Sequence, residues 1–188
     1  VQRLGRDPRP EEVAEELDLS PITLIDNLVR PPRQALEQAA TLLLEARAPA
    51  ILAGSRVTEA GGCDSLVELA ELLGAPVISE SGTTHGRLAF PSDHPLYSQG
   101  LPLWSPDVHA RLDPFDVIFV AGMDMLRQYI YHEPACPIPD HVRLIHLDED
   151  PWQLGKNYQP EVGLVGHTRA GLEELVELVG TGQNEEQK

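Results

Sequence analysis

The sequence predicts an α/β fold in which a doubly wound, mostly parallel sheet of about six strands carries helices on both faces. Short apolar runs at residues 50–53, 116–121 and 142–147 have the length and continuity of strands that are buried on both sides. Amphipathic segments alternate with these runs, which is typical of parallel strands joined by right-handed helical crossovers. The expected architecture is therefore Rossmann-like.

The first helix is expected to begin at the Pro31-Pro32 pair, because proline is well tolerated in the first turn of a helix. Its apolar stripe repeats at helical spacing and consists of Leu36, Ala39, Ala40 and Leu43. The strand at 50–53 then ends in a glycine turn. A second helix is expected over residues 63–73, with Gly74 as a left-handed C-terminal cap.

The rest of the chain continues the alternation of strands and helices. The expected elements are a strand at 75–79, an irregular stretch at 80–100, a helix at 105–112, strands at 116–121, 142–147 and 161–165, and a helix from Thr168 that stops at Gly180. The first thirty residues are polar and interrupted by prolines. Three divisions follow: an interdomain linker at residues 1–30, one domain at 31–180, and a polar tail at 181–188.

Composition limits the classes of function. The net charge is -16, whereas binding to nucleic acid or to an anionic membrane requires a basic face. No apolar run approaches the about 20 residues of a membrane span. Cys63 and Cys136 are far apart and lack metal-ligand spacing, so a reducing, cytoplasmic setting is expected. The chain begins at Val1 rather than Met, which suggests a fragment of a longer polypeptide.

The turn Gly54-Ser55-Arg56 is the first candidate for cofactor binding. Ligands of doubly wound folds bind where the strands end, and small residues let backbone N–H groups approach a phosphate. Gly122 and Asp148 end other strands, and a carboxylate there can accept ribose hydroxyl groups. The alternative is a structural turn at Gly54 and an Asp148 that caps its own turn. A single glycine followed by Ser and Arg favours the structural turn, although Arg56 could still meet a phosphate.

A polar and aromatic segment is the candidate wall of a substrate pocket. It follows the strand at 116–121 and contains Arg127, Tyr129, Tyr131 and His132. Substrate could approach there, and the alternative is packing against a neighbouring domain. No residue is assigned as catalytic, because the chain has neither a nucleophile elbow nor a Walker loop. No metal site is expected either, because no cluster of His, Cys, Asp and Glu has ligand spacing.

Several segments, in their order and spacing, resemble the central domain of thiamine-diphosphate-dependent enzymes such as acetolactate synthases and benzoylformate decarboxylases. The matching segments are residues 49–54, 69–77, 90–96, 115–122, 144–151, 157–158 and 162–166. Residues 125–131 are similar to the benzoylformate decarboxylase branch, except that Tyr129 stands where that branch has a histidine.

The resemblance implies the central domain of a 2-oxo-acid decarboxylase or carboligase, which serves interdomain packing and forms one wall of the substrate pocket. In this family a glutamate of the N-terminal domain activates thiamine diphosphate, and a Gly-Asp-Gly motif of the C-terminal domain holds Mg²⁺. This chain contains no Gly-Asp-Gly, so both sites are expected outside it and the isolated domain is expected to be inactive. The implied partners are the N- and C-terminal domains of the same chain, in a homodimer or homotetramer.

The alternative function is a nucleotide-binding module for FAD, or for the ADP part of CoA, in an acetolactate synthase-like or oxidase-like enzyme. It would use the Gly54 turn and Asp148. Gly166-His167 stands where nucleotide-binding relatives carry Gly-Asp, which disfavours this alternative. An NAD-dependent domain of the sirtuin-like group would need a glycine-rich acidic first loop, which the sequence lacks.

Overall fold

The computed structural model of the protein describes residues 28–80, 88–126 and 136–186. In these ranges one parallel sheet has the strand order β3-β2-β1-β4-β5-β6. The strands are β1 (Pro49–Ala53), β2 (Val77–Ser79), β3 (Tyr97–Gly100), β4 (Val117–Ala121), β5 (Arg143–Asp148) and β6 (Val162–Val165). The predicted doubly wound sheet is confirmed, and its two halves meet where β1 lies beside β4.

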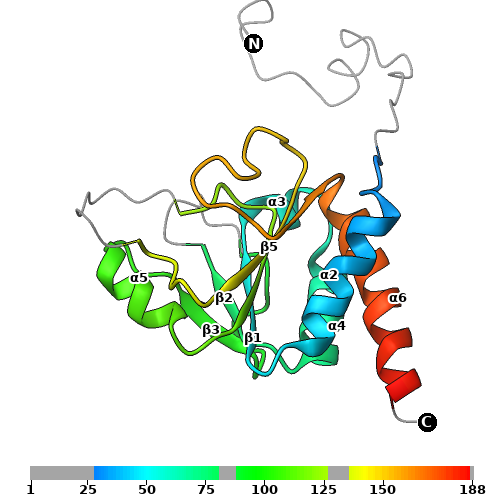
Figure 1. The fold of residues 1–188 in the computed structure, drawn as a ribbon, viewed down its shortest axis with the longest axis horizontal. Helices are drawn as coiled ribbons and strands as arrows, with labels where there is room; N and C mark the ends of the chain where they lie inside the picture. Colours follow the sequence, from blue (N-terminus) through cyan, green and yellow to red (C-terminus); the bar gives the residue numbers. More distant parts are fainter. Residues whose placement is uncertain (1–27, 81–87, 127–135, 187–188) are drawn as a thin grey trace, which may run out of the picture.

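Helices cover both faces of this sheet (Figure 1). Three of them, α2 (Arg33–Glu45), α4 (Cys63–Leu73) and α6 (Thr168–Glu186), pack together on one face. The opposite face carries α5 (Ser105–Leu112), and the short α3 (Ser55–Glu59) directly follows β1. We call the side on which the strands end the carboxyl edge, and the side on which they begin the amino edge.

Two apolar clusters fill the space on either side of the sheet. Phe119 packs on the side of α2, α4 and α6, whereas its neighbours Ile118 and Val120 pack on the side of α5. Successive side chains of a strand point to opposite faces, so a strand covered on both faces is apolar at every position. This explains why β4 is a continuous apolar run without alternation.

The helix expected over residues 63–73 is confirmed as α4, and Gly74 adopts the left-handed cap with φ 59°. Two other expectations were wrong. The stretch at 80–100 contains the edge strand β3, whose polar, half-exposed Tyr-Ser-Gln-Gly sequence gives no strand pattern. The final helix does not stop at Gly180 but continues to Glu186, and Gln183 Nε2 donates a 2.6 Å hydrogen bond to Leu72 O that holds this extension on α4.

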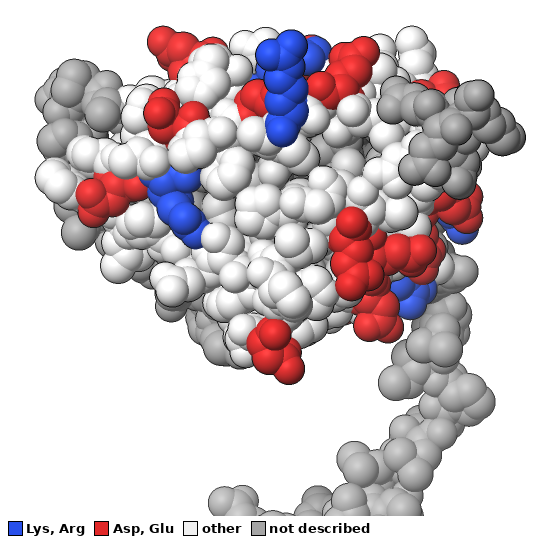
Figure 2. Space-filling view, turned by 90° about the horizontal axis from the view of Figure 1, so that it is seen from below, with Lys and Arg blue, Asp and Glu red and all other residues white. Residues whose placement is uncertain are grey.

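None of the helices in the described ranges is long and apolar enough to cross a membrane. Figure 2 views the molecule from below Figure 1, on the side where the turn between α2 and β1 lies. Acidic side chains and fewer basic ones are scattered over this face, without a continuous basic patch (Figure 2). The distribution agrees with the net charge of -16.

Candidate functional site

The five predicted cofactor-binding residues meet at the carboxyl edge. Gly54 follows β1, Ser55 and Arg56 open α3, Gly122 follows β4, and Asp148 is the last residue of β5. In folds of this strand order, the place where β1 and β4 diverge is the usual ligand crevice. The structure thus brings the five residues together at one edge of the sheet.

The two glycines of the crevice pack against each other. Gly54 N–H donates to Ala121 O at 2.9 Å, and Arg56 N–H donates to Gly122 O at 3.1 Å. A Cβ atom on Gly54 would lie only 2.3 Å from Gly122 O. Gly122 has φ 58°, a left-handed conformation that glycine adopts without strain. Glycine is thus required at both positions by the close approach of two backbone segments, independently of any ligand.

A cluster of ion pairs lies beside these glycines. Arg56 donates from Nε and Nη2 to Asp148 Oδ2 at 3.0 and 2.5 Å, and from Nη2 to Asp124 Oδ1 at 2.8 Å. Asp148 is fully buried, and its Oδ1 accepts the Asp150 N–H at 2.9 Å. Burial lowers the pKa of the Arg56 guanidinium, but hydrogen bonds and charge from Asp148 and Asp124 outweigh burial and raise it. The guanidinium therefore stays charged between two carboxylates.

His146 lies on β5 two residues before Asp148 and is also buried. Its Nε2 is 3.1 Å from Met123 O, so this nitrogen carries the proton and donates. Nδ1 has no partner among the described residues. Burial lowers the pKa of His146, and the positive charge of Arg56 acts in the same direction, while Asp148 and Asp124 oppose it. The imidazole is therefore held in its neutral form.

This arrangement fits a nucleotide poorly. Ribose hydroxyl groups need free carboxylate oxygens, but Asp148 Oδ1 is engaged by Asp150 N–H and Oδ2 by Arg56. A phosphate would add a third negative group to a guanidinium that already faces two carboxylates. Nor do the residues fit a Mg²⁺-diphosphate site, since the described ranges hold no group of three or more His, Cys, Asp or Glu side chains arranged for a metal.

Sequence analysis missed two members of this cluster, Asp124 and His146. Asp124 stands two residues after Gly122, as Arg56 stands two residues after Gly54, and this parallel spacing after two strands was the available signal. Nothing in the sequence pattern indicated that His146 would be buried and neutral. The candidate substrate-pocket residues Arg127, Tyr129, Tyr131 and His132 lie outside the described residues.

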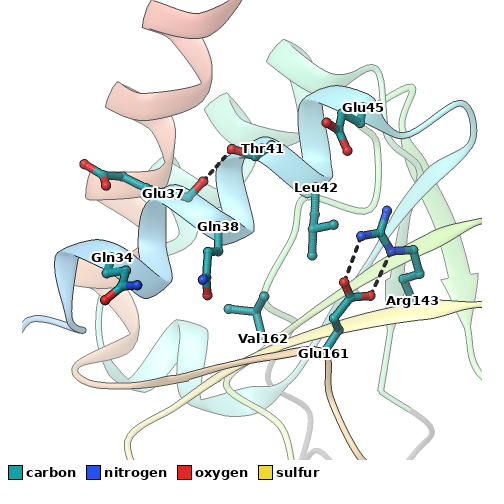
Figure 3. Close-up of a pocket in the computed structure, with 9 residues that line it drawn as sticks. All are labelled: Gln34, Glu37, Gln38, Thr41, Leu42, Glu45, Arg143, Glu161 and Val162. Carbon is teal, nitrogen blue, oxygen red and sulfur yellow. Dashed lines mark hydrogen bonds and ion pairs between the residues drawn. The ribbon is translucent and has the colours of Figure 1, made fainter.

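A separate open groove of about 580 Å³ lies between α2 and the beginnings of β5 and β6 (Figure 3). Gln38 of α2 points toward it over Val162 (Figure 3). Its only arginine, Arg143, forms two 2.8 Å hydrogen bonds with Glu161 on the strand side of the groove (Figure 3). Both side chains are almost half exposed, and each supplies the hydrogen-bond partners of the other.

Comparisons with known proteins agree with this geometry. The chain is 30% identical over 156 residues to an acetolactate synthase of Mycobacterium avium, with 80% of this chain and 24% of that protein covered. It is 33% identical over 173 residues to a sulfoacetaldehyde acetyltransferase of Roseovarius nubinhibens, with 82% and 26% covered. The chain thus spans about a quarter of the length of these relatives.

The crystal structure of a benzoylformate decarboxylase from Polynucleobacter necessarius is similar in fold, with a TM-score of 0.76 at 23% identity; the match covers 87% of this chain and 30% of that one. Residues 36–175 match the family described as thiamine pyrophosphate enzyme, central domain, which is another name for the thiamine diphosphate family that the sequence resembles. The match takes in every strand of the sheet together with the crevice. The chain therefore belongs to the family of central domains of thiamine pyrophosphate enzymes.

Proposed function

We propose that these residues form the structural core between the catalytic parts of a thiamine-diphosphate-dependent decarboxylase or carboligase that acts on 2-oxo acids. The family match supports the enzyme class. The observation that carries the structural role is the ion pair between Arg56 and Asp148, because it lies where a domain of this topology would hold a nucleotide. In this proposal no cofactor binds at this position, and the residues there serve the stability of the domain. These residues are Gly54, Ser55, Arg56, Gly122 and Asp148.

Thiamine diphosphate and Mg²⁺ would be held by parts of the longer polypeptide outside these residues. The lack of a Gly-Asp-Gly sequence supports this placement. The partners would be the domains before and after this one, in an oligomer of the whole enzyme. Residues 1–30 would then be the linker from the preceding domain.

The segment with Arg127, Tyr129, Tyr131 and His132 would form one wall of the substrate pocket, since it follows β4 at the carboxyl edge. In the longer enzyme, Arg127→Ala and His132→Ala should change kcat or KM for a 2-oxo acid without changing the unfolding midpoint. Equal kinetics for wild type and both variants would contradict this assignment.

The closed crevice is tested by thermal unfolding of the 188-residue chain with FAD, ADP, CoA and NAD. No ligand should raise the midpoint, because each would have to displace Arg56 from two carboxylates. A ligand-dependent rise that Asp148→Ala abolishes would overturn the proposal. The chain alone should also release no CO₂ from a 2-oxo acid, with or without thiamine diphosphate and Mg²⁺.

A further inference from the structure

An open groove lies beside the edge strand β3 and shares no residue with the crevice or with the groove beside α2. Its volume is about 490 Å³. β3 is the outermost strand of the sheet, and α5 lies near it (Figure 1). The residues that line the groove come from β3, from the connection after it and from α5. They are Tyr97, Ser98, Gln99, Gly100, Pro102 and Arg111.

Arg111, in the last turn of α5, supplies the only charged side chain in the lining of this groove. Its Nη2 donates to the carbonyl oxygen and to the hydroxyl oxygen of Ser98, both at 2.5 Å. Nε and Nη1 have no acceptor among the described residues, and neither atom is sealed from solvent. Several N–H donors of the guanidinium therefore remain available to a ligand.

Arg111 differs from most arginines of this domain because it has no carboxylate partner. The arginines that form ion pairs in the described ranges are Arg30, Arg33, Arg56, Arg143 and Arg169. Within those ranges, Arg111 and Arg47 form none. Arg47 is exposed, so water solvates its charge, whereas Arg111 is half-buried. A half-buried cation without a counter-charge favours the binding of an anion from solution.

The lack of an ion pair at Arg111 is not due to a lack of acidic residues nearby in the chain. Asp107 stands four positions earlier on α5, and residues at this spacing share one side of a helix. The guanidinium nevertheless turns to the neutral oxygen atoms of Ser98. Arg111 is thus held at the groove while no carboxylate of the described residues compensates its charge.

The backbone of β3 is irregular where Arg111 contacts it. The register between β2 and β3 shifts between Val77 and Ser79, which marks a bulge. Gln99 is left-handed at this point, with φ 56°, a conformation that is uncommon for residues other than glycine. Bulges redirect side chains at sheet edges and beside functional sites. Ser98 lies in this bulge and presents both of its oxygen atoms to the guanidinium.

We propose that this groove binds a small oxyanion, a carboxylate or a phosphate group, through the guanidinium of Arg111. The planar guanidinium matches the oxygen atoms of either group, and such charge-assisted hydrogen bonds are stronger than neutral ones. Ser98 orients the guanidinium, while Tyr97 and Pro102 offer apolar surface to the rest of the ligand. The site lies outside the crevice and does not depend on which reaction the longer enzyme catalyses.

Proton–nitrogen NMR of the 188-residue chain tests this proposal. Sodium phosphate and sodium acetate are added separately, with sodium chloride at the same ionic strength as the reference. The Nε–H signal of Arg111 and the backbone N–H signal of Gly100 should shift saturably with an oxyanion but not with chloride. Saturation by phosphate alone identifies a phosphate ligand, and saturation by acetate alone identifies a carboxylate. No saturable shift with either oxyanion would overturn the proposal.

Arg111→Gln removes the charge but keeps a side-chain amide that can donate to Ser98. It should weaken binding by about tenfold or more, the factor that corresponds to the loss of a hydrogen bond to a charged group. Arg47→Gln is the matched control, because it removes the other described arginine without a carboxylate partner and changes the net charge equally. Its affinity for the oxyanion should equal that of wild type. Equal weakening in the two variants would mean that net charge, not the groove, attracts the anion, and would overturn the proposal.

Arg111→Lys keeps the test decisive if Arg111→Gln does not fold. It retains the positive charge but loses the planar fork of donors, so it should bind the oxyanion more weakly than wild type. The signal that disappears in this variant also assigns Arg111 Nε–H. Wild-type affinity in Arg111→Lys would contradict binding through the guanidinium.

Discussion

Arg56 and Asp148 lie 92 positions apart in the chain, yet Arg56 Nε is 3.0 Å from Asp148 Oδ2 at the carboxyl edge. Arg56 belongs to α3 after β1, whereas Asp148 ends β5, and β4 lies between these two strands. The ion pair therefore reaches across β4 and ties the two halves of the sheet together. Because Asp148 is fully buried, breaking this ion pair would leave a buried carboxylate without its opposite charge.

Arg56→Met should destabilise the domain by about 3–5 kcal/mol, which is the usual cost of removing one partner of a buried ion pair. The double variant Arg56→Met/Asp148→Asn should recover part of that loss, because a neutral amide then replaces the fully buried carboxylate, while Asp124 loses its bond to Arg56 in both variants. Urea unfolding of the two variants and the wild type measures the difference. A double variant that is less stable than Arg56→Met would contradict this account. Arg33→Ala is the control, since the Arg33–Glu37 pair is exposed and its loss should change the unfolding curve little.

Gly54→Ala should be among the most damaging single-methyl additions in this chain. The new Cβ atom would stand 2.3 Å from Gly122 O, and backbone must move to admit it, at a cost of about 1–3 kcal/mol or more. Gly163→Ala is the matched control, because its Cβ atom would be 3.9 Å from the nearest atom, Pro160 Cγ. Thermal unfolding should show a large fall for the first and little change for the second. Similar midpoints would show that the crevice is looser than its geometry indicates.

His146 should make stability depend on pH below about 6.5. Burial lowers its pKa in the folded state, so the unfolded chain binds the proton first as the pH falls. Its contribution to stability is therefore complete above the unfolded pKa and is lost as the pH decreases from there toward the folded pKa. Urea unfolding between pH 7.5 and about pH 5 should show a steeper decline for wild type than for His146→Gln. Parallel curves would mean that His146 does not titrate differently in the two states.

The groove beside α2 should be energetically unimportant despite its well-formed ion pair. Hydrogen bonding to Arg143 lowers the pKa of Glu161, but both side chains are almost half exposed and water screens their attraction. Glu161→Gln should therefore change the free energy of unfolding by less than about 1 kcal/mol. Urea unfolding checks this, and a loss comparable to that of Arg56→Met would reveal a structural role for the groove.

The sequence predicted an element correctly where a single physical requirement determines the residue types. The continuous apolar run of β4 reflects burial on both faces, and Gly74 reflects a left-handed cap that few other residues tolerate. It failed at β3, where a half-exposed edge strand requires no apolar pattern. It also failed at Gly180, because contacts of the last turns with Leu72 and Leu44 override the tendency of glycine to end a helix.

The candidate site shows a similar division. The sequence indicated which residues stand at the ends of strands, because strand ends and the glycines that follow them are local features. It did not predict that Arg56 would turn onto Asp148 and Asp124, since this depends on side chains brought together from three strand ends. The same residues were compatible with a phosphate contact and with an internal ion pair, and only the three-dimensional arrangement distinguishes the two.

The position of α6 has a consequence for synthesis of the protein. This helix is the last element of the sheet domain to be made, yet Leu172, Leu175 and Val179 complete the apolar cluster formed by α2 and α4, which are made earlier. On a translating ribosome that cluster stays open to solvent until the chain has been extended through α6. The domain can therefore reach its final packing only after nearly its whole length has emerged, and until then its early helices depend on other means of avoiding aggregation.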